Sequence, residues 1–166
     1  MDLPDRNPNP NRNPAFLVNA GGSHMENHGS TVFNHERLEV YRAAILFIAW
    51  VSDLLADAEK VGDVKVQLDR AATSIALNIA EGNGKYAAKD RCRFFDIAHG
   101  CALECAAGLD VLVAKGRFTD AEIREGKQRL LRIVRLLIGL IKSNSVREYR
   151  RREEKDRGHD DRQWSE

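Results

Sequence analysis

Residues 67–82 read Gln-Leu-Asp-Arg-Ala-Ala-Thr-Ser-Ile-Ala-Leu-Asn-Ile-Ala-Glu-Gly, with apolar side chains recurring at every third or fourth position. This spacing places them on one face of an α-helix, which we expect to run from about residue 64 to residue 81. The members of the stripe are Leu68, Ala71, Ala72, Ile75 and Ile79. Gly82-Asn83-Gly84 follows, and glycine and asparagine accept the left-handed conformation that ends many helices. We therefore predict that the helix ends before this sequence.

The same spacing predicts three more helices, at about residues 36–58, 87–115 and 119–143. The first has two apolar stripes, which are Leu38, Tyr41, Ile45 and Ile48 on one side and Val40, Ala44, Phe47, Val51 and Leu54 on the other. Gly116 is the expected C-cap of the third helix. Thr119 and Glu122 form the capping box that begins the fourth.

No segment shows the alternation of apolar and polar residues that is typical of a β-strand. Four helices with short connections predict an all-α fold, an antiparallel up-down-up-down four-helix bundle. The first and fourth helices carry more apolar surface than one core can cover. A monomer would expose a patch large enough to drive association, so the sequence predicts a homo-oligomer.

The two ends of the 166-residue chain differ from its middle. All four prolines fall within the first 14 residues, in an Asn- and Pro-rich stretch with too little apolar surface to become ordered. We predict a disordered segment at 1–34, the bundle at 35–146 and a charged C-terminal extension at 147–166. Gly22-Ser23-His24-Met25 is typical of the remnant of a cleaved expression tag. A chance sequence, with Met25 as the true start, is the alternative.

Composition argues against several classes of protein. The net charge is +1, so the overall basic charge of many nucleic-acid-binding domains is absent, although a local basic surface is compatible with it. The longest apolar run, at residues 43–51, is too short to cross a bilayer, and no signal-peptide pattern is present. Cys92, Cys101 and Cys105 are an odd number of clustered cysteines. They predict a reducing, cytoplasmic location, and we expect no membrane partner.

The 67–82 stretch resembles the second-helix signature of a bacterial four-helix-bundle family, related to the ribosomal protein encoded in intervening sequences of large-subunit rRNA genes. The family pattern is Q-L-x-R-A-x-x-S-I-x-x-N-I-A-E-G, and the resemblance includes residues 38–43 and 94–104 within a span of about 33–143. Cys101 stands where the family usually has serine, which puts the hydrogen bond of that serine in doubt. The proline common in the family's first connection is absent.

This resemblance implies a helical bundle that assembles into rings, with a pentamer expected. It also implies association with the ribosome or another RNA, through the genomic origin of the family. We therefore expect a non-enzymatic, homo-oligomeric interaction or scaffold protein whose partners are its own copies and RNA. The alternative is a bundle that binds a small molecule or a metal at the end of the second helix.

Four polar residues are the candidate site for that alternative. Ser74, Asn78 and Glu81 share one helical face, and Glu104 of the third helix is expected to meet them. In the structural interpretation they form a buried network that satisfies the amides near residues 82–84. In the functional interpretation they bind a ligand or partner at one end of the bundle.

Two groups of basic residues are candidates for phosphate contact, the physical basis of sequence-independent nucleic-acid binding. They are Lys85, Lys89, Arg91 and Arg93 after the Gly-Asn-Gly sequence, and Arg132 and Arg135, with Arg124, Lys127, Arg129 and Lys142, on the fourth helix. Acidic residues are interleaved with them, so a solvated helix face is the alternative interpretation. A ring of identical subunits would repeat each group and multiply its local potential.

The sequence predicts neither a metal site nor a catalytic site. Cys101 and Cys105 lie one turn apart with His99 nearby, but a structural zinc site normally takes four ligands. The residues at 82–85 lack the spacing and the preceding strand of a phosphate loop. No serine or histidine falls in a motif that would pair a nucleophile with a base. We expect no enzymatic activity and no cofactor.

Overall fold

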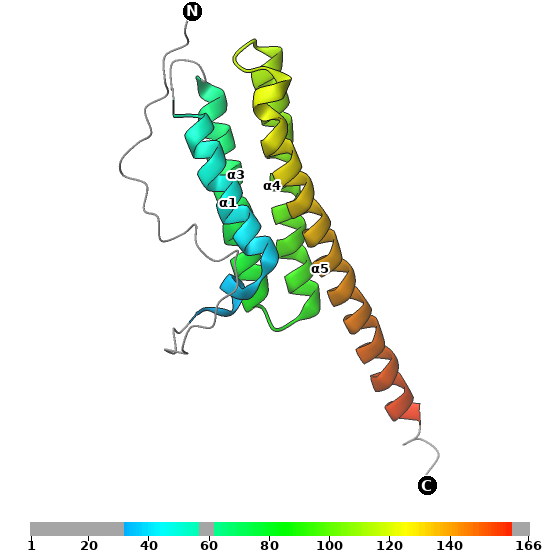
Figure 1. Ribbon diagram of the computed structural model, residues 1–166. Helices are drawn as coiled ribbons and strands as arrows, with labels where there is room; N and C mark the ends of the chain where they lie inside the picture. Colours follow the sequence, from blue (N-terminus) through cyan, green and yellow to red (C-terminus); the bar gives the residue numbers. More distant parts are fainter. Residues whose placement is uncertain (1–31, 57–61, 161–166) are drawn as a thin grey trace, which may run out of the picture. The chain divides into compact units, whose positions relative to one another are not determined.

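The computed structural model describes residues 32–56 and 62–160, with side chains up to residue 146. Within these ranges the chain forms helices and no β-strand, which confirms the all-α class. The elements are the 3-10 helix η2 (Asn34–Arg37) and the long helices α1 (Glu39–Leu54), α3 (Asp63–Gly84), α4 (Ala88–Ala114) and α5 (Asp120–Asp160) (Figure 1). Residues 1–31 of the segment predicted to be disordered, including the Gly22–Met25 sequence, lie outside the described residues.

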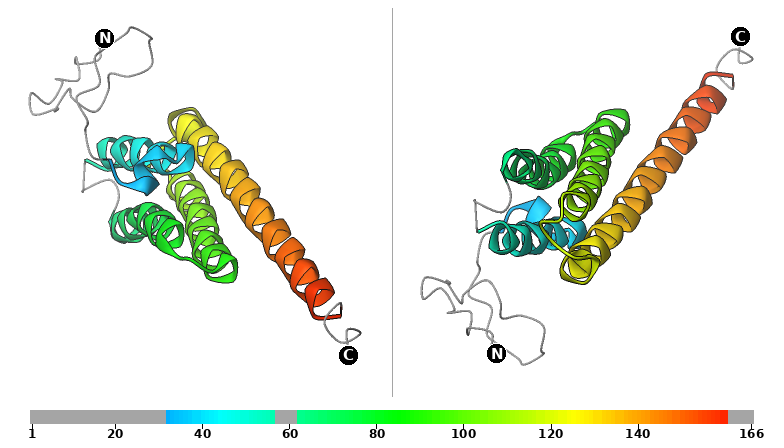
Figure 2. Two further views of the ribbon diagram at one scale, coloured as in Figure 1. Left: turned by 90° about the horizontal axis from the view of Figure 1, so that it is seen from below. Right: turned by 90° about the horizontal axis from the view of Figure 1, so that it is seen from above.

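Each long helix packs against two others. α3 contacts α1 and α4, α5 contacts α4 and α1, and η2 lies against α1 and α3 (Figures 1 and 2). The largest side chains with almost no exposure are Phe47, Leu55, Leu68, Ile75, Ile79, Leu109, Leu112, Leu130, Ile133 and Leu137. All five residues of the stripe predicted within 67–82 are buried, so the spacing of that stretch identified the core face correctly.

α1 begins at residue 39, later than the apolar spacing predicts. The residues before it form the 3-10 turn η2, in which the Glu36 carboxylate accepts a hydrogen bond of 2.6 Å from the Phe33 amide. Leu38 is extended (φ −72°, ψ 126°), so the turn does not continue into the α-helix. α1 ends at residue 54, and its predicted end at residue 58 lies outside the described residues.

The predicted end of the second helix is wrong. α3 continues through Gly84, and the only positive φ angles among the described residues belong to Gly62 and Gly116. Gly82 permits close packing instead of ending the helix. A Cβ atom at this position would lie 2.8 Å from Cε1 of Phe95 and 3.0 Å from Cβ of Phe94. α4 therefore approaches α3 through the space that this glycine leaves open.

A second glycine brings the same two helices together further along. A Cβ atom at Gly108 of α4 would lie 2.8 Å from Cδ2 of Leu68, which is buried on α3. Each helix thus presents a glycine to a large apolar side chain of the other. Because protein interiors are close-packed, these two contacts hold the helices at one separation and in one register.

The predicted signals between the third and fourth helices are confirmed. Gly116 adopts a φ of +65°, and the amides of this residue and the next donate to the carbonyls of Val113 (2.8 Å) and Leu112 (2.9 Å). This pair of bonds is the Schellman arrangement of a helix C-terminus. Thr119 then forms the capping box, since its amide donates to the Glu122 carboxylate at 2.8 Å and its hydroxyl accepts from the Glu122 amide at 3.4 Å.

α5 is 41 residues long, so the helix expected to run to about residue 143 or further continues to Asp160. Its last buried side chain among those described is Asn144, whose amide group donates to the Leu140 carbonyl at 2.8 Å. Beyond this point α5 continues past the ends of the other three long helices (Figures 1 and 2). The charged extension that begins at residue 147 is therefore helical as far as Asp160.

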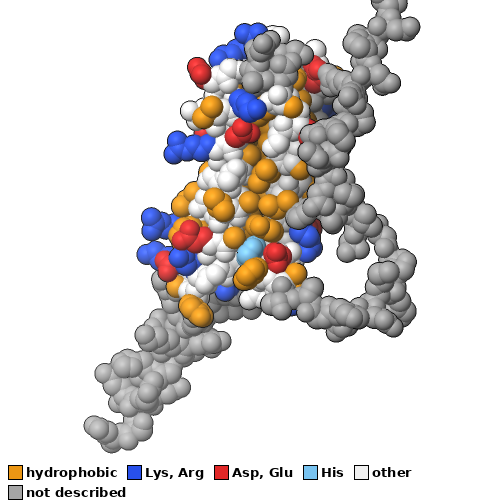
Figure 3. Space-filling view, turned by 90° about the vertical axis from the view of Figure 1, so that its left-hand side faces the viewer, with side chains coloured by type: hydrophobic (Ala, Val, Ile, Leu, Met, Phe, Trp, Pro, Cys, Tyr) orange, Lys and Arg blue, Asp and Glu red, His pale blue; other side chains and the backbone are white. Residues whose placement is uncertain are grey.

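Apolar side chains are exposed on every long helix. On α1, the stripe made of Leu38, Tyr41, Ile45 and Ile48 is half-buried against the core. The exposed large apolar side chains of the long helices are Leu46, Val66, Leu77, Ile97, Leu103, Val111, Leu131, Ile138 and Val146. Figure 3 shows hydrophobic side chains gathered over α1 and α3, with charged side chains at the margins. Of the nine exposed side chains named above, one lies on α1, two lie on α3, and three lie on each of α4 and α5.

Among the described helices, only α4 is long and apolar enough to cross a membrane by length and composition. The core helix of a soluble protein passes the same test, so this property is weak support for a membrane span. α4 contributes Phe95, Ala98, Ala102, Cys105 and Leu109 to the core.

We predict that Gly82→Ala lowers the free energy of unfolding by about 1–3 kcal/mol, because the added methyl group overlaps the Phe95 ring. Gly100 is the matched control, since it is exposed on α4 and no atom lies within 4 Å of its Cβ position. Gly100→Ala is expected to be neutral or to stabilise by up to about 1 kcal/mol. Urea unfolding followed by circular dichroism measures both. Equal stabilities of the two variants would contradict the close approach at Gly82.

Candidate functional site

Ser74 and Asn78 lie one turn apart on α3, and both are half-buried. The Asn78 amide group donates to the Ser74 carbonyl at 2.8 Å and to the Ser74 hydroxyl at 3.0 Å. These bonds stay within the helix. Asn78 therefore does not satisfy the amides at the helix end, which is the role that the structural interpretation of the sequence gave it.

Cys101 of α4 joins this pair from the neighbouring helix. Its thiol donates to the Ser74 hydroxyl at 3.1 Å, so Ser74 links α3 to α4. Cys101, at the position where the resemblance led us to expect serine, thus makes a hydrogen bond of its own, with sulfur as the donor.

A hollow of about 360 Å³ opens between α3 and α4 beside this contact. It is lined by Gln67, Arg70, Ala71, Ser74, Cys101 and Glu104. A second hollow of about 300 Å³ shares Gln67 and Glu104 with the first and is lined mainly by apolar side chains. Glu104 therefore lies on the Ser74 side, as predicted. Gln67 and Arg70 were missed, although their spacing of seven and four residues before Ser74 places them on the same helical face.

Glu81 lies apart from this hollow. It is exposed, and its carboxylate pairs with the Lys85 ammonium group at 3.0 Å. The same ammonium group lies 4.8 Å from the centre of the Phe94 ring, which is a cation–π contact. Ser74 thus contacts Asn78 and lines the same hollow as Glu104. Glu81, the fourth predicted polar residue, forms an ion pair with Lys85 instead.

The three thiols occupy different surroundings. Cys105 is buried one turn after Cys101, and burial, with smaller contributions from Cys101 and Glu104, raises its pKa to about 12. Cys92 is half-buried and contacts α5, where its sulfur lies 3.6 Å from the Ile141 carbonyl. Within the described ranges, no group of three His, Cys, Asp or Glu side chains gathers closely enough to hold a metal ion.

Two of the basic residues near the α3–α4 connection bond to other described residues, and two do not. Arg91 donates from Nε to the Lys85 carbonyl at 2.6 Å and so fastens the start of α4 to the end of α3. Lys85 is held by Glu81. Lys89 and Arg93 are exposed, and neither pairs with any residue that the structure describes.

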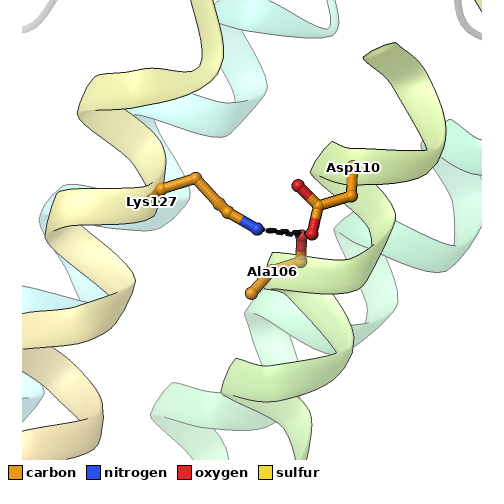
Figure 4. A network of polar contacts seen from close by, with 3 residues as sticks. All are labelled: Ala106, Asp110 and Lys127. Carbon is orange, nitrogen blue, oxygen red and sulfur yellow. Dashed lines mark hydrogen bonds and ion pairs between the residues drawn. The ribbon is translucent and has the colours of Figure 1, made fainter. Parts of the chain in front are cut away.

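Lys127 of α5 is engaged by α4. Its ammonium group donates to the Asp110 carboxylate at 2.5 Å and to the Ala106 carbonyl at 3.1 Å (Figure 4). The contact joins residues that are distant in the sequence, and a half-exposed pair of this kind contributes only modestly to stability. Because its charge is paired with Asp110, Lys127 contributes less to the basic surface predicted for α5.

Two more cations of α5 are paired. Arg129 contacts Glu125 one turn earlier at 2.5 Å, and Arg132 contacts Glu39 of α1 at 2.7 Å. Arg135 is exposed without a partner among the described residues. Of the ten residues predicted for phosphate contact, five are engaged within the described part of the chain. The other five are exposed without a described partner, namely Lys89, Arg93, Arg124, Arg135 and Lys142.

The family model described as 23S rRNA-intervening sequence protein matches residues 36–139, which is more than half of the chain. The chain belongs to the 23S rRNA-intervening sequence protein family. This match confirms the resemblance carried by the 67–82 stretch. It covers the Ser74–Cys101 contact and both hollows, and it ends within α5. No curated protein matches the chain.

We predict that Cys105 resists maleimide at about pH 8, because the reagent attacks the thiolate and burial raises the pKa of this thiol. Mass spectrometry of the folded protein should find the label on Cys92 or Cys101, and Cys105→Ala should leave that pattern unchanged. Fast labelling of Cys105 would contradict its burial. Because its pKa is raised above the ordinary 9.0, the stability that it contributes is lost as pH rises from 9.0 toward 12.

Proposed function

We propose that this chain is a non-enzymatic, cytoplasmic, homo-oligomeric helical protein that acts as an interaction or scaffold module on ribosomal or other RNA. Its helices follow an antiparallel up-down-up-down path, and its subunits form a ring in which five copies are expected. Membership of the 23S rRNA-intervening sequence protein family supports the association with RNA. The packing of α3 and α5 against their neighbours supports the antiparallel path.

Exposed apolar side chains support self-association. Val66 and Leu77 of α3 are 66% and 64% exposed, and Leu103 of α4 is 51% exposed. Contiguous apolar patches on a soluble monomer commonly mark an interaction surface. Contact between copies of the chain would remove these side chains from water.

The observation that carries the association with RNA is the set of cations that have no carboxylate partner in the described part of the chain. Lys89, Arg93 and Arg135 belong to it. An overall charge of +1 does not prevent a local positive potential, because exposed charges act over about 10 Å at 0.1 M ionic strength. Repetition around a ring would multiply that potential.

Two side chains that could act as nucleophiles, Ser74 and Cys105, lack the activation that catalysis would need. The Ser74 hydroxyl accepts hydrogen bonds from Asn78 and Cys101. Burial keeps the Cys105 thiol protonated near neutral pH. Neither group has the activated form that a nucleophile requires.

The hollow between α3 and α4 favours a second candidate function, the binding of a small molecule. It combines the polar lining of Arg70, Ser74 and Glu104 with an adjoining apolar part. A ligand with one polar and one apolar end fits that division. This site would include Glu104 but not Glu81.

Native mass spectrometry and the ratio of absorbance at 260 and 280 nm test the two functions on protein purified at low salt. The first predicts a multiple of the 18.7-kDa chain and nucleic acid that is shed as salt increases, since phosphate contacts are salt-sensitive. A monomer at micromolar concentration would overturn the oligomer. Protein free of nucleic acid that carries a small additional mass would favour the second function instead.

A further inference from the structure

We propose that the phosphate groups of RNA are held where the first turns of α4 meet the later part of α5, at a basic junction made of Lys89, Arg93, Arg135 and Lys142. This inference rests on the proposed association with RNA and names the surface that makes the contact. All four side chains are exposed, and none pairs with a described residue.

The contact between α4 and α5 at Cys92 brings three of these cations onto adjoining segments. The Cys92 sulfur lies 3.6 Å from the Ile141 carbonyl and 3.7 Å from the Ser145 hydroxyl. On α4, Lys89 lies one turn before Cys92, and Arg93 follows it directly. On α5, Lys142 follows Ile141. Figure 1 shows these parts of the two helices side by side.

α5 supplies cations here without any acidic residue of its own. Between Glu125 and Glu148 the sequence has six basic residues and no acidic one. Three of the six pair with carboxylates, as described above for Lys127, Arg129 and Arg132. Arg135 and Lys142 do not. They are seven residues apart, which puts them on one face of the helix and separates them by about 10 Å along its axis.

The acidic residues around the basic junction do not cancel its charge. Asp90 and Asp96 are the exposed acidic residues on this part of α4. Against four cations, these two carboxylates leave a local sum of +2.

The arrangement suits a polyanion better than a single ion. The four cations are spread along two helices and do not converge on one point. α5 also continues beyond them as far as Asp160. A nucleic-acid backbone presents phosphates in a row and can meet such a series one contact at a time. Lys142 and all that follows lie outside the part of the chain that matches the family.

The test removes three charges in each of two places. The junction variant is Lys89→Gln, Arg93→Gln and Lys142→Gln. Its matched control is Lys115→Gln, Arg117→Gln and Arg124→Gln, which removes the same charge from exposed side chains, unpaired among the described residues, at the end of α4 and the start of α5. Both sets of side chains are at the surface, so circular dichroism should give unchanged helix content. Fluorescence anisotropy with a labelled oligo(U) single strand measures affinity over a series of salt concentrations.

We expect the junction variant to bind about a hundredfold more weakly at about 0.1 M salt. Each phosphate contact on a single strand contributes about 0.7 to the slope of log affinity against log salt, so the slope should fall by about 2. The control should stay within a few-fold of the unaltered protein. Equal losses in both variants would overturn the junction but keep the association with RNA. Failure of the unaltered protein to bind oligo(U), or its binding to anionic lipid vesicles alone, would overturn the proposed function itself.

Discussion

The close approach of α3 and α4 is the constraint on which the other features depend. Gly82 receives the Phe95 ring, and Gly108 receives Leu68. These contacts set the separation at which the Cys101 thiol reaches the Ser74 hydroxyl at 3.1 Å. They also determine the width of the hollow between the helices. A methyl group at either glycine would push apart the elements that carry these polar contacts, so packing and site geometry share one cause.

The distribution of charge follows from which cations the fold engages. Lys127 ties α5 to α4, Arg132 ties α5 to α1, and Arg91 ties the start of α4 to the end of α3. The two carboxylate contacts lower the positive potential at their own places, whereas Arg91 keeps its charge because its acceptor is a neutral carbonyl. Lys89 and Arg93 remain exposed where α4 begins. A net charge close to zero thus conceals an uneven surface, because pairing removes positive charge selectively.

The periodicity of the sequence predicted what depends on one helix at a time. The buried stripe of 67–82, the glycine C-cap at 116 and the capping box at Thr119 are local patterns, and the structure confirms them. Contacts between two helices could not be predicted from the periodicity of either helix alone. The Gly-Asn-Gly sequence alone predicted that the helix ends before Gly82. The packing role of this glycine depends on Phe95, which lies on another helix and could not be inferred from the local sequence. Glu81 appeared to belong with Ser74, but its partner Lys85 lies on the solvent side. Whether a predicted phosphate-contact residue is already ion-paired likewise depends on carboxylates distant in the sequence, as for Lys127 with Asp110 and Arg132 with Glu39.

The length of α5 has a consequence for how its outer part forms. At a rise of about 1.5 Å per residue, 41 residues span about 60 Å, against about 40 Å for the 27 residues of α4. The packed part serves as a nucleus, so each outer turn needs only propagation and avoids the unfavourable first step of helix formation. The outer turns of α5 therefore depend for their formation on the part of the same helix that packs against α1 and α4.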